Sequence, residues 1–191
     1  MPNIAYLSLG SNIEPETNLK SALRLLACYT DLLAVSSVWE TKPVGLIDQP
    51  NFLNAAAIIA TELAADQLKQ QVLLKIESCL GRQRQVNKNA PRTIDIDIMF
   101  FNRQIFNLAD RRIPDPEVLE RPFVAIPLAE IAPDYVHPET GQNLQEIAHA
   151  FEIKADEMQL REDMEDLLTQ FMNRTTVVSS TIKNPHLERK L

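Results

Sequence analysis

The run PRTIDIDIMFF at residues 91–101 most constrains the fold, because its alternating pattern is that of a half-buried β-strand. Side chains two residues apart on a strand point to the same face, so Asp95 and Asp97 project together. The alternate positions would face a hydrophobic core, and they are Ile94, Ile96 and Ile98. Two carboxylates held side by side repel each other, and a bound divalent cation removes that cost. The run therefore predicts a strand with an acidic pair suited to a hard cation.

A cationic segment precedes this strand. Residues 82–92 contain no acidic side chain and four basic ones: Arg82, Arg84, Lys88 and Arg92. The acidic pair and the basic segment each have an alternative explanation. An Asp-x-Asp strand is often only solvated, and a basic segment is often a solvated loop. Their adjacency favours Mg²⁺ together with a polyphosphate, because phosphate chemistry needs both charges within one site.

Composition excludes several classes of protein. The chain has 191 residues, a hydrophobic content of 45% and a net charge of −7. These values favour one globular domain, and a general nucleic-acid binder would more often be basic. No signal peptide and no membrane-spanning apolar run is apparent, so we expect a soluble cytoplasmic protein without nucleic-acid or membrane partners.

Metal and disulfide frameworks are also disfavoured by the residue counts. Two cysteines and three histidines make neither a zinc site nor a disulfide network. Cys28 and Cys79 fall on predicted helix faces, where we expect them to be small core residues. The four glycines form no Walker-type phosphate loop, which disfavours a P-loop kinase.

The order of the predicted elements indicates the fold class. Hydrophobic periodicity predicts strands at 3–9, 32–40, 52–61 and 91–101, and helices at 14–29 and 65–80. This β-α-β-β-α-β order predicts a ferredoxin-like α+β fold, an antiparallel sheet with helices on one face. The other face would be free for a ligand between loops 41–51 and 82–92. Smaller pieces are expected as a returning strand at 104–107 and helices at 117–120, 124–131 and 144–151.

The chain changes character near residue 152. We expect a catalytic domain at 1–151 and an extension, not a separate domain, at 152–191. An amphipathic helix is predicted over 156–172, with its apolar positions at Leu160, Met164, Leu167, Leu168 and Phe171. Packing of this helix on the domain predicts a monomer, and a dimer formed through the helix is the alternative.

Four residues have two interpretations each. Trp39 suits a core position or a pocket wall. Asn54 interrupts an apolar strand, so its amide is bonded to the backbone or to a ligand. Glu77, in the last turn of a predicted helix, is a surface residue or faces a ligand. Arg121, between apolar neighbours, is an exposed arginine with a packed stem or a phosphate ligand.

Five segments resemble the 6-hydroxymethyl-7,8-dihydropterin pyrophosphokinase family, in family order and spacing. They are AYLSLGSN (5–12), DQPNFLNAA (48–56), GRQR (81–84), PRTIDIDIMFF (91–101) and ERPFVAIPLAEIAPD (120–134). The resemblance covers residues 3–150. It implies transfer of the terminal pyrophosphoryl group of ATP to the pterin hydroxymethyl oxygen in folate biosynthesis, with release of AMP.

The resemblance also implies roles for individual residues. Asp95 and Asp97 would hold two Mg²⁺ ions, and the catalytic set would be Arg82, Arg92, Asp95 and Asp97. The ATP-binding residues would be Glu77, Arg82, Arg84, Arg92, Ile98 and Arg121. The pterin pocket would be formed by Thr41, Pro43, Val44, Phe52, Asn54 and Phe123, with Asn54 bonded to the pterin edge and the two phenylalanines on either side of its ring.

The sequence departs from the family pattern at three places. Asn89 and Ala90 stand where many members have Trp-Gly before the PR dipeptide, so closure over the pterin would be differently built. Asp115 replaces the histidine of a Pro-His-Pro segment, which weakens ATP binding unless its carboxylate points elsewhere. Leu74 replaces a nucleotide contact. Two alternatives stay open: another Mg²⁺-dependent phosphoryl or nucleotidyl transferase, and a catalytically weak protein that binds pterin or nucleotide.

Overall fold

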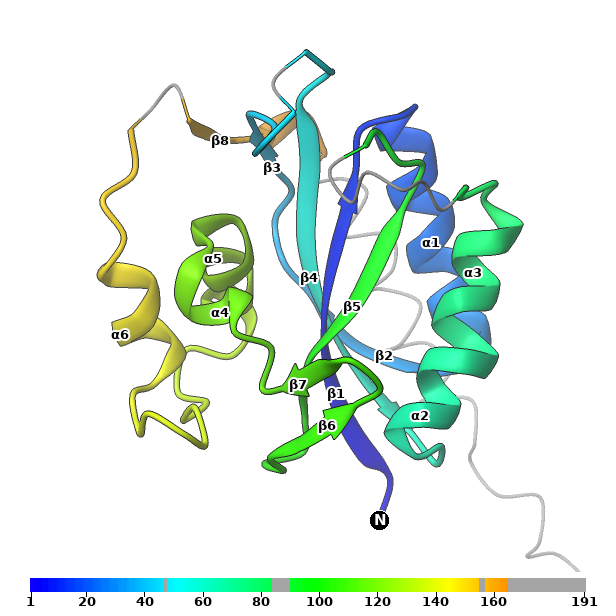
Figure 1. The fold of residues 1–191 in the computed structure, drawn as a ribbon, viewed down its shortest axis with the longest axis vertical. Coiled ribbons are helices and arrows are strands. Elements are labelled where there is room, and N and C mark those ends of the chain that lie inside the picture. The colour runs from blue at the N-terminus through cyan, green and yellow to red at the C-terminus, as the bar shows by residue number, and fades with distance from the viewer. Residues whose placement is uncertain (47, 84–89, 155–156, 165–191) are drawn as a thin grey trace, which may run out of the picture.

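The protein is built on one antiparallel sheet, seen nearly edge-on in Figure 1. The computed structural model describes residues 1–46, 48–83, 90–154 and 157–164. The sheet strands are β1 (Asn3–Ser11), β2 (Asp31–Val35), β3 (Trp39–Thr41), β4 (Phe52–Thr61), β5 (Asp95–Phe101) and β8 (Met158–Leu160). Their order is β5-β1-β4-β3-β8, and β2 also pairs with β4. The predicted α+β class with an antiparallel sheet is confirmed.

One face of the sheet carries the main hydrophobic core. It is covered by α1 (Pro15–Tyr29) and by a second helical run made of α2 (Ala65–Leu68), the π-helical turn η1 (Lys69–Leu73) and α3 (Leu74–Cys79). Leu19, Leu23 and Leu26 of α1 are fully buried against this face. Ile96 and Ile98 of β5, and Ile94 just before it, are buried in the same core, as predicted. The carboxylates between them must therefore project to the opposite face.

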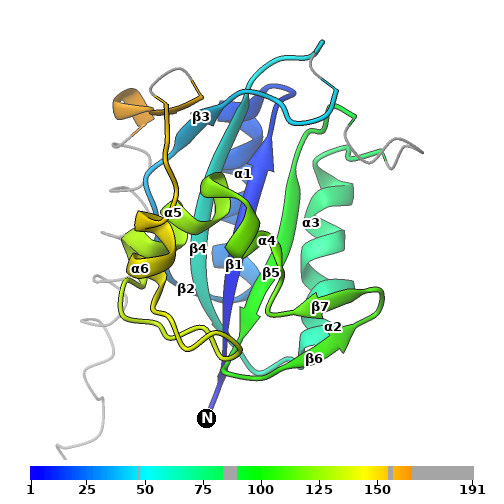
Figure 2. The same cartoon turned by 60° about the vertical axis from the view of Figure 1, so that its left-hand side comes forward.

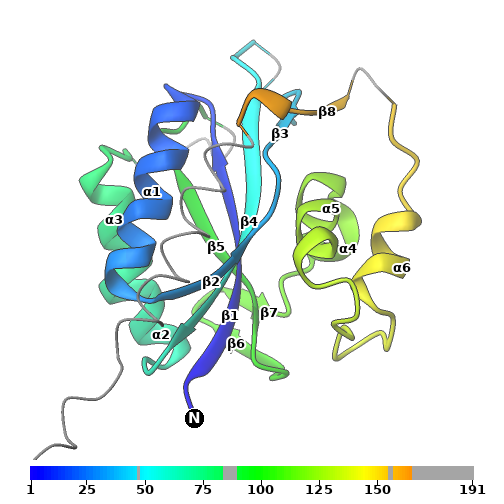
Figure 3. The same cartoon turned by 180° about the vertical axis from the view of Figure 1, so that it is seen from behind.

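The opposite face is only partly free, because helices cover one part of it and a cavity remains over the rest. Three short helices lie over it: α4 (Glu117–Glu120), α5 (Pro122–Ile131) and α6 (Leu144–His149). Val124, Ala125 and Leu128 of α5 are buried against β4 in a second hydrophobic cluster. The helices at 117–120 and 124–131 were predicted. Which face of the sheet they would cover was not. Figures 2 and 3 show α5 and α6 stacked on this side of the sheet.

Three other predictions about local structure are corrected. The strand predicted at 32–40 is split into β2 and β3, because the backbone N–H of Ser36 donates to Ala56 and its hydroxyl accepts from Ala56 N–H at 2.8 Å. The returning strand lies at β6 (Phe106–Leu108) and pairs with β7 (Arg111–Ile113) in a separate hairpin. Cys28 and Cys79 are exposed and are not core residues, because each lies after the last buried residue of its helix, Leu26 and Glu77.

The predicted tail helix is wrong at its start. Met158–Leu160 form β8, which pairs with β3, and Glu162–Met164 form one 3₁₀ turn, η2. The free edge of β3 offers backbone hydrogen bonds that outweigh the helical periodicity of this short segment. Leu167, Leu168 and Phe171 lie outside the described residues, so the dimer contact stays a prediction. Within the described ranges, no helix combines the length and apolar character needed to span a bilayer.

Candidate active site

Asp95 and Asp97 lie side by side on the α5 face of β5. Their side chains are 20% and 16% exposed. Asp95 is paired across the sheet with Gly10 of β1, and Asp97 with Ser8. Gly10 is paired on its other side with Asn54 of β4. Small residues on the central strand therefore leave a hollow above the sheet between the acidic pair and Asn54.

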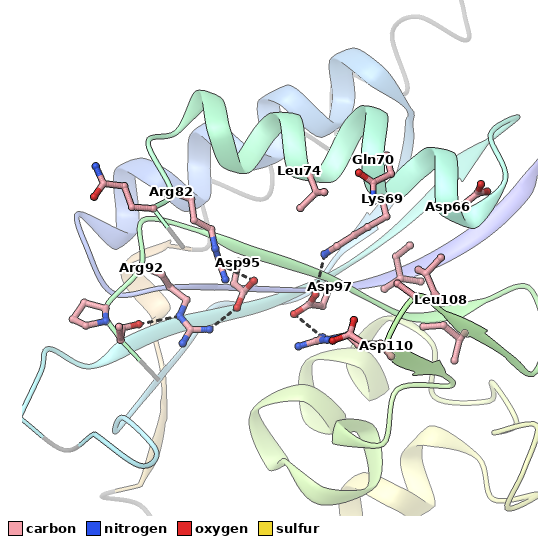
Figure 4. Close-up of a pocket in the computed structure, with 17 residues that line it drawn as sticks. Asp66, Lys69, Gln70, Leu74, Arg82, Arg92, Asp95, Asp97, Leu108 and Asp110 are labelled. Carbon is pink, nitrogen blue, oxygen red and sulfur yellow. Dashed lines mark hydrogen bonds and ion pairs between the residues drawn. The ribbon is translucent and has the colours of Figure 1, made fainter. Parts of the chain in front are cut away.

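Two arginines neutralise Asp95. Arg82 Nη1 lies 2.7 Å from Asp95 Oδ1, and Arg92 Nη1 lies 2.5 Å from Asp95 Oδ2. Burial alone would raise the pKa of Asp95, but the charges and hydrogen bonds of Arg82 and Arg92 hold it below its ordinary value. Figure 4 shows both guanidinium groups converging on this carboxylate. Asp95 is thus a charged carboxylate held between two cationic side chains.

Asp97 is neutralised by two cations that the sequence analysis did not single out. Lys69 Nζ donates to Asp97 Oδ1 at 3.0 Å and to the carbonyl of Ile96 at 2.8 Å. Arg111 Nη1 lies 2.8 Å from Asp97 Oδ2. Lys69 begins the π-helical turn, and Arg111 begins β7, so both come from elements distant in sequence. The position of Lys69 on its helix was one weak indication of this role, because Gln70 and Leu74 of the same helical run also line this site.

Glu77 supports β5 and is not a surface residue. Its side chain is only 4% exposed, and Oε1 accepts a hydrogen bond from the backbone N–H of Ile96 at 3.0 Å. Oε2 lies 3.7 Å from Arg82 Nε. Burial raises the pKa of Glu77, although the Ile96 hydrogen bond and nearby Lys69 and Arg82 oppose that shift. Of the two interpretations, exposure is wrong, and the carboxylate acts on β5 and Arg82.

Asn12, at the end of the Gly-Ser-Asn turn, joins two loops of the site. Its Oδ1 accepts from the backbone N–H of Arg92 at 2.8 Å. Its Nδ2 donates to Gln49 Oε1 at 2.9 Å and to the Pro50 carbonyl at 3.2 Å. The side chain is buried, so these bonds are shielded from water. Asn12 therefore connects the segment before β5 to the loop between β3 and β4.

The first of two cavities along the acidic pair is strongly charged. Its volume is about 460 Å³, and it is bounded by the α2–α3 run, the segment around residue 91 and the β6–β7 hairpin. Four cations line it: Lys69, Arg82, Arg92 and Arg111. Leu74, Ala90 and Ile98 are also in its wall. We call this space the charged cavity.

The second cavity, of about 270 Å³, lies on the other side of the acidic pair. Its wall includes five of the six predicted pterin residues: Thr41, Val44, Phe52, Asn54 and Phe123. Pro43 is not in the wall, although its neighbours Lys42 and Val44 are. Arg121 lines this space, not the charged cavity. We call it the aromatic cavity, and both cavities share Arg92, Asp95, Asp97 and Arg111.

The Asn54 amide is fixed by a neighbouring side chain. Asn54 Nδ2 donates to Thr41 Oγ1 at 2.8 Å, and both residues are buried. A Cβ atom on Gly10 would lie 3.1 Å from Asn54 Oδ1, so glycine leaves this oxygen its place. Trp39 is half-buried and its indole N–H donates to Glu130 at 2.6 Å, outside both cavities. Trp39 therefore lies neither in the core nor in the wall of either cavity.

Asp115 lines neither cavity. Its carboxylate is buried, accepts from the backbone N–H of Glu117 at 3.0 Å and lies 3.3 Å from Arg111. Burial raises the pKa of Asp115, with Asp97 and Glu120 adding to the shift. The carboxylate that replaces the family histidine thus holds Arg111, the cation beside Asp97. Arg84 and Asn89 lie outside the described residues.

The donor set fits a cation that shares its coordination with a ligand. Within the described part of the chain, no group of three or more His, Cys, Asp and Glu side chains could hold a metal ion. Asp95 and Asp97 supply hard oxygen atoms on one face, and Mg²⁺ is usually bound by one or two carboxylates together with phosphates and water. The arrangement combines an acidic pair with four cations, which is chemistry suited to a cation bound together with a polyphosphate.

Comparison with known proteins agrees with this chemistry. The model of the 7,8-dihydro-6-hydroxymethylpterin-pyrophosphokinase family matches residues 6–133, and the chain belongs to that family. A 2-amino-4-hydroxy-6-hydroxymethyldihydropteridine pyrophosphokinase of Bacillus subtilis is 46% identical over 134 residues, covering 69% of this chain and 79% of that protein. The protein of the same name from Haemophilus influenzae is 37% identical over 150 residues, covering 77% and 92%.

Longer proteins also match. The folic acid synthesis protein fol1 of Pneumocystis carinii is 40% identical over 141 residues, which cover 73% of this chain but 19% of that protein. The crystal structure of wild-type Plasmodium falciparum HPPK-DHPS with pterin and p-hydroxybenzoate superposes with a TM-score of 0.65 at 17% identity. It covers 84% of this chain and 48% of the Plasmodium chain, and this likeness establishes the fold alone.

Proposed function

We propose that the protein transfers the terminal pyrophosphoryl group of ATP to the hydroxymethyl oxygen of 6-hydroxymethyl-7,8-dihydropterin, giving AMP and the pterin diphosphate. This is a step of folate biosynthesis. One observation carries the proposal: a charged cavity and an aromatic cavity meet at Asp95 and Asp97. Transfer between two substrates requires that the phosphorus and the attacking oxygen lie at such a junction.

The charged cavity suits the triphosphate of ATP. Arg82 and Arg92 present planar guanidinium groups, which bind phosphate oxygens in pairs. Lys69 and Arg111 bring two further positive charges to the same wall. Glu77 acts on the nucleotide side by positioning Arg82, and Arg84 keeps the phosphate role that the resemblance implies. Arg121 would reach the phosphates from the wall of the aromatic cavity. Leu74 and Ile98 give the cavity an apolar surface for the nucleoside.

Asp95 and Asp97 would hold two Mg²⁺ ions. Bound Mg²⁺ would neutralise the phosphate oxygens and orient them for in-line attack. Arg82, Arg92, Lys69 and Arg111 now lie against the two carboxylates. We propose that these cationic side chains turn to the phosphates when the carboxylates bind the ions, which conserves the charge balance of the site.

The aromatic cavity suits the pterin. Phe52 and Phe123 supply two aromatic faces in its wall, and Asn54 supplies an amide that can pair with the polar edge of a pterin. Thr41 orients that amide. Pro43 contributes by shaping the chain between Lys42 and Val44. Asp97 and Glu117, which both line this cavity, are the groups placed to receive the proton of the attacking hydroxyl. Burial raises the pKa of Glu117, which makes its carboxylate a stronger base.

The fold description, the domain division, the location and the oligomeric state complete the proposal. The strand order β5-β1-β4-β3 supports a ferredoxin-like description of the sheet. We assign the catalytic domain to 1–151 and an extension to 152–191. We further propose a cytoplasmic monomer that acts on small molecules alone. Light scattering of the full chain tests the monomer, since a doubled mass would favour the dimer alternative.

Product analysis tests the function. The protein is mixed with Mg²⁺, ATP and 6-hydroxymethyl-7,8-dihydropterin, and the nucleotides are separated by chromatography. AMP that forms only when the pterin is present supports pyrophosphoryl transfer. ADP or free pyrophosphate would instead favour a different Mg²⁺-dependent transferase. Tight binding of both substrates without turnover would favour the binding protein.

A further inference from the structure

The strand β8 lies outside the part of the chain that matches the family model, which ends at residue 133. It nevertheless completes the sheet at its β3 edge, where Thr41 is paired with Met158 and Trp39 with Leu160. Figures 1 and 3 show β8 beside β3 at one end of the sheet. β3 has three residues, and a strand this short gains much of its order from its neighbours on both sides.

The segment around β8 is anchored to the domain in three ways. Met158 and Met164 are buried, and Met164 belongs to the main hydrophobic core. The backbone N–H of Arg161 donates to the carbonyl of Val38 at 2.9 Å, and Lys42 N–H lies 3.4 Å from the carbonyl of Glu157. Backbone hydrogen bonds thus run from just before β3 to just after it.

Arg161 adds a side-chain contact that reaches Glu40 of β3. Arg161 Nη1 donates to Glu40 Oε2 at 3.2 Å, while Nη2 lies 2.6 Å from Glu16 of α1. Asp163 holds the other side of the guanidinium at 2.8 Å. The Arg161 side chain is 23% exposed, so water screens these ion pairs only in part. Arg161 therefore joins β3 to the first turn of α1.

Glu40 also contacts the loop between β3 and β4. Its second oxygen, Oε1, accepts from Asn51 Nδ2 at 2.9 Å. Asn51 ends that loop, and Lys42 begins it directly after Thr41 of β3. The chain Arg161–Glu40–Asn51 therefore closes the base of the loop that contributes Lys42 and Val44 to the aromatic cavity. Thr41, the next residue, fixes the amide of Asn54.

We propose that Arg161 is a positioning residue for the pterin substrate, acting through Glu40 on Thr41 and on the β3–β4 loop. This role rests on the proposed function of the aromatic cavity. Arg161 touches neither cavity. Its loss should loosen the wall that holds Asn54 and Val44 and leave the cations around Asp95 and Asp97 in place. Pterin binding should therefore weaken while nucleotide binding does not.

The test compares Arg161→Met and Arg161→Lys with Lys154→Met in the full chain. Lys154 is on the same extension, is highly exposed and pairs only weakly with Glu157 at 3.6 Å, so its replacement removes the same charge without touching β3. Calorimetry measures the Kd of a non-hydrolysable ATP analogue with Mg²⁺, and then the Kd of 6-hydroxymethylpterin in the presence of that analogue. Hydrogen exchange measures the protection of the amides at residues 41–46 without ligand.

We expect Arg161→Met to raise the pterin Kd about tenfold, from loss of charged hydrogen bonds, and to speed exchange at residues 41–46. The analogue Kd should stay within about twofold, because the charged cavity has no contact with Arg161. Lys154→Met should match the wild type in all three measurements. Arg161→Lys should recover part of the pterin affinity, because one ammonium replaces only part of the fork.

Two results would overturn the role of Arg161. One is wild-type pterin affinity and exchange in Arg161→Met. The other is an equal rise in both Kd values with a lower Tm, which indicates a general loss of stability. If the wild-type protein binds the analogue but no pterin, the proposed function fails, and this role of Arg161 fails with it. That outcome is distinct, because it appears in the wild type before any variant is compared.

Discussion

The two cavities share four side chains but are built on different principles. The charged cavity is formed by cations held against two carboxylates, and several of its residues, at 82–83, at 90–92 and in β5, are neighbours in sequence. To the four charged residues that it shares, the aromatic cavity adds uncharged side chains from β3, β4, the β3–β4 loop and α5: Thr41, Phe52, Asn54, Val44 and Phe123. Lys42, Glu117 and Arg121 also lie in its wall. Charged residues that are neighbours in sequence predict the chemistry of a site directly. The role of a pocket formed by Thr, Asn and Phe can be inferred only from the fold that brings these residues together.

The cavities also differ in how their polar groups are compensated. Each carboxylate of the acidic pair has two cationic partners from different segments, and we propose that these partners exchange for ions and phosphates. Asn54 has one neutral partner, Thr41, within a hydrogen-bonded sheet. The first arrangement allows charge to be redistributed during a reaction. The second holds one fixed shape, which suits recognition.

The largest effect should come from the acidic pair. We expect Asp97→Asn to lower kcat/KM for pterin-dependent AMP formation by about 10³-fold, because one ligand of the phosphate-neutralising ions is lost. Circular dichroism should show that the fold is retained. Asp134→Asn, an exposed change outside both cavities, is the control. Activity of Asp97→Asn near the wild-type rate would remove the acidic pair from the chemistry.

A smaller effect is expected for Arg92, which lines both cavities. Arg92→Lys keeps the charge but loses the planar fork that contacts Asp95 and lies 5.6 Å from the centre of the Phe52 ring. We expect kcat/KM to fall about 10²-fold, with KM raised for both substrates. Steady-state kinetics with each substrate varied in turn measures this. A KM change for one substrate alone would show that the cavities are less closely joined than the geometry indicates.

Replacement of Asn54 should separate the two cavities. Asn54→Ala removes the amide that Thr41 orients, and we expect KM for the pterin to rise about tenfold with KM for ATP unchanged. Asn107→Ala, an exposed change on β6, is the matched control. An equal increase in both KM values would contradict the assignment of this cavity to the pterin.

The smallest effect is in the pH dependence of stability. Burial raises the pKa of Glu77 above 4.5, so the native state binds this proton more tightly than the unfolded chain. Stability from this group is therefore complete below the unfolded pKa and is lost as the pH rises through the native pKa. Asp95 has a lowered pKa and acts oppositely, losing its contribution as the pH falls below about its ordinary 3.8.

Urea unfolding at several pH values tests the direction of this pH dependence. Between about pH 4.5 and neutrality, the free energy of unfolding of Glu77→Gln should decline less with pH than that of the wild type. Glu62→Gln, at an exposed position, should follow the wild-type curve. A steeper decline in Glu77→Gln than in the wild type would show that the ion pair with Arg82, not burial, governs this carboxyl.

Local pattern predicted much of the fold. The helix ending at Tyr29, the strand at 52–61 and the inward isoleucines of β5 follow from periodicity over long segments. Long-range pairing could not be predicted in this way. The face covered by α5 depends on which apolar surface α5 meets, and β8 forms because the edge of β3 is available. A three-residue strand has too little pattern to be told from one helical turn.

The same limit applies to the site. Asp95, Asp97, Arg82 and Arg92 are close in sequence, and the structure brings them together. Lys69 and Arg111 reach Asp97 only through the packing of the helical run and the β6–β7 hairpin against β5. The acidic residue at 115 could not be interpreted without Arg111, its partner. Burial of Glu77 depends on its hydrogen bond to Ile96, nineteen positions later.

The central claim is that a divalent cation at Asp95 and Asp97 joins the two cavities. Electron paramagnetic resonance of Mn²⁺, added in place of Mg²⁺ with a non-hydrolysable ATP analogue, measures this most directly. We predict bound Mn²⁺ in the wild type, a signal that changes when 6-hydroxymethylpterin is added, and loss of bound Mn²⁺ in the Asp95→Asn, Asp97→Asn double variant. Equal Mn²⁺ binding by the double variant and the wild type would contradict the claim.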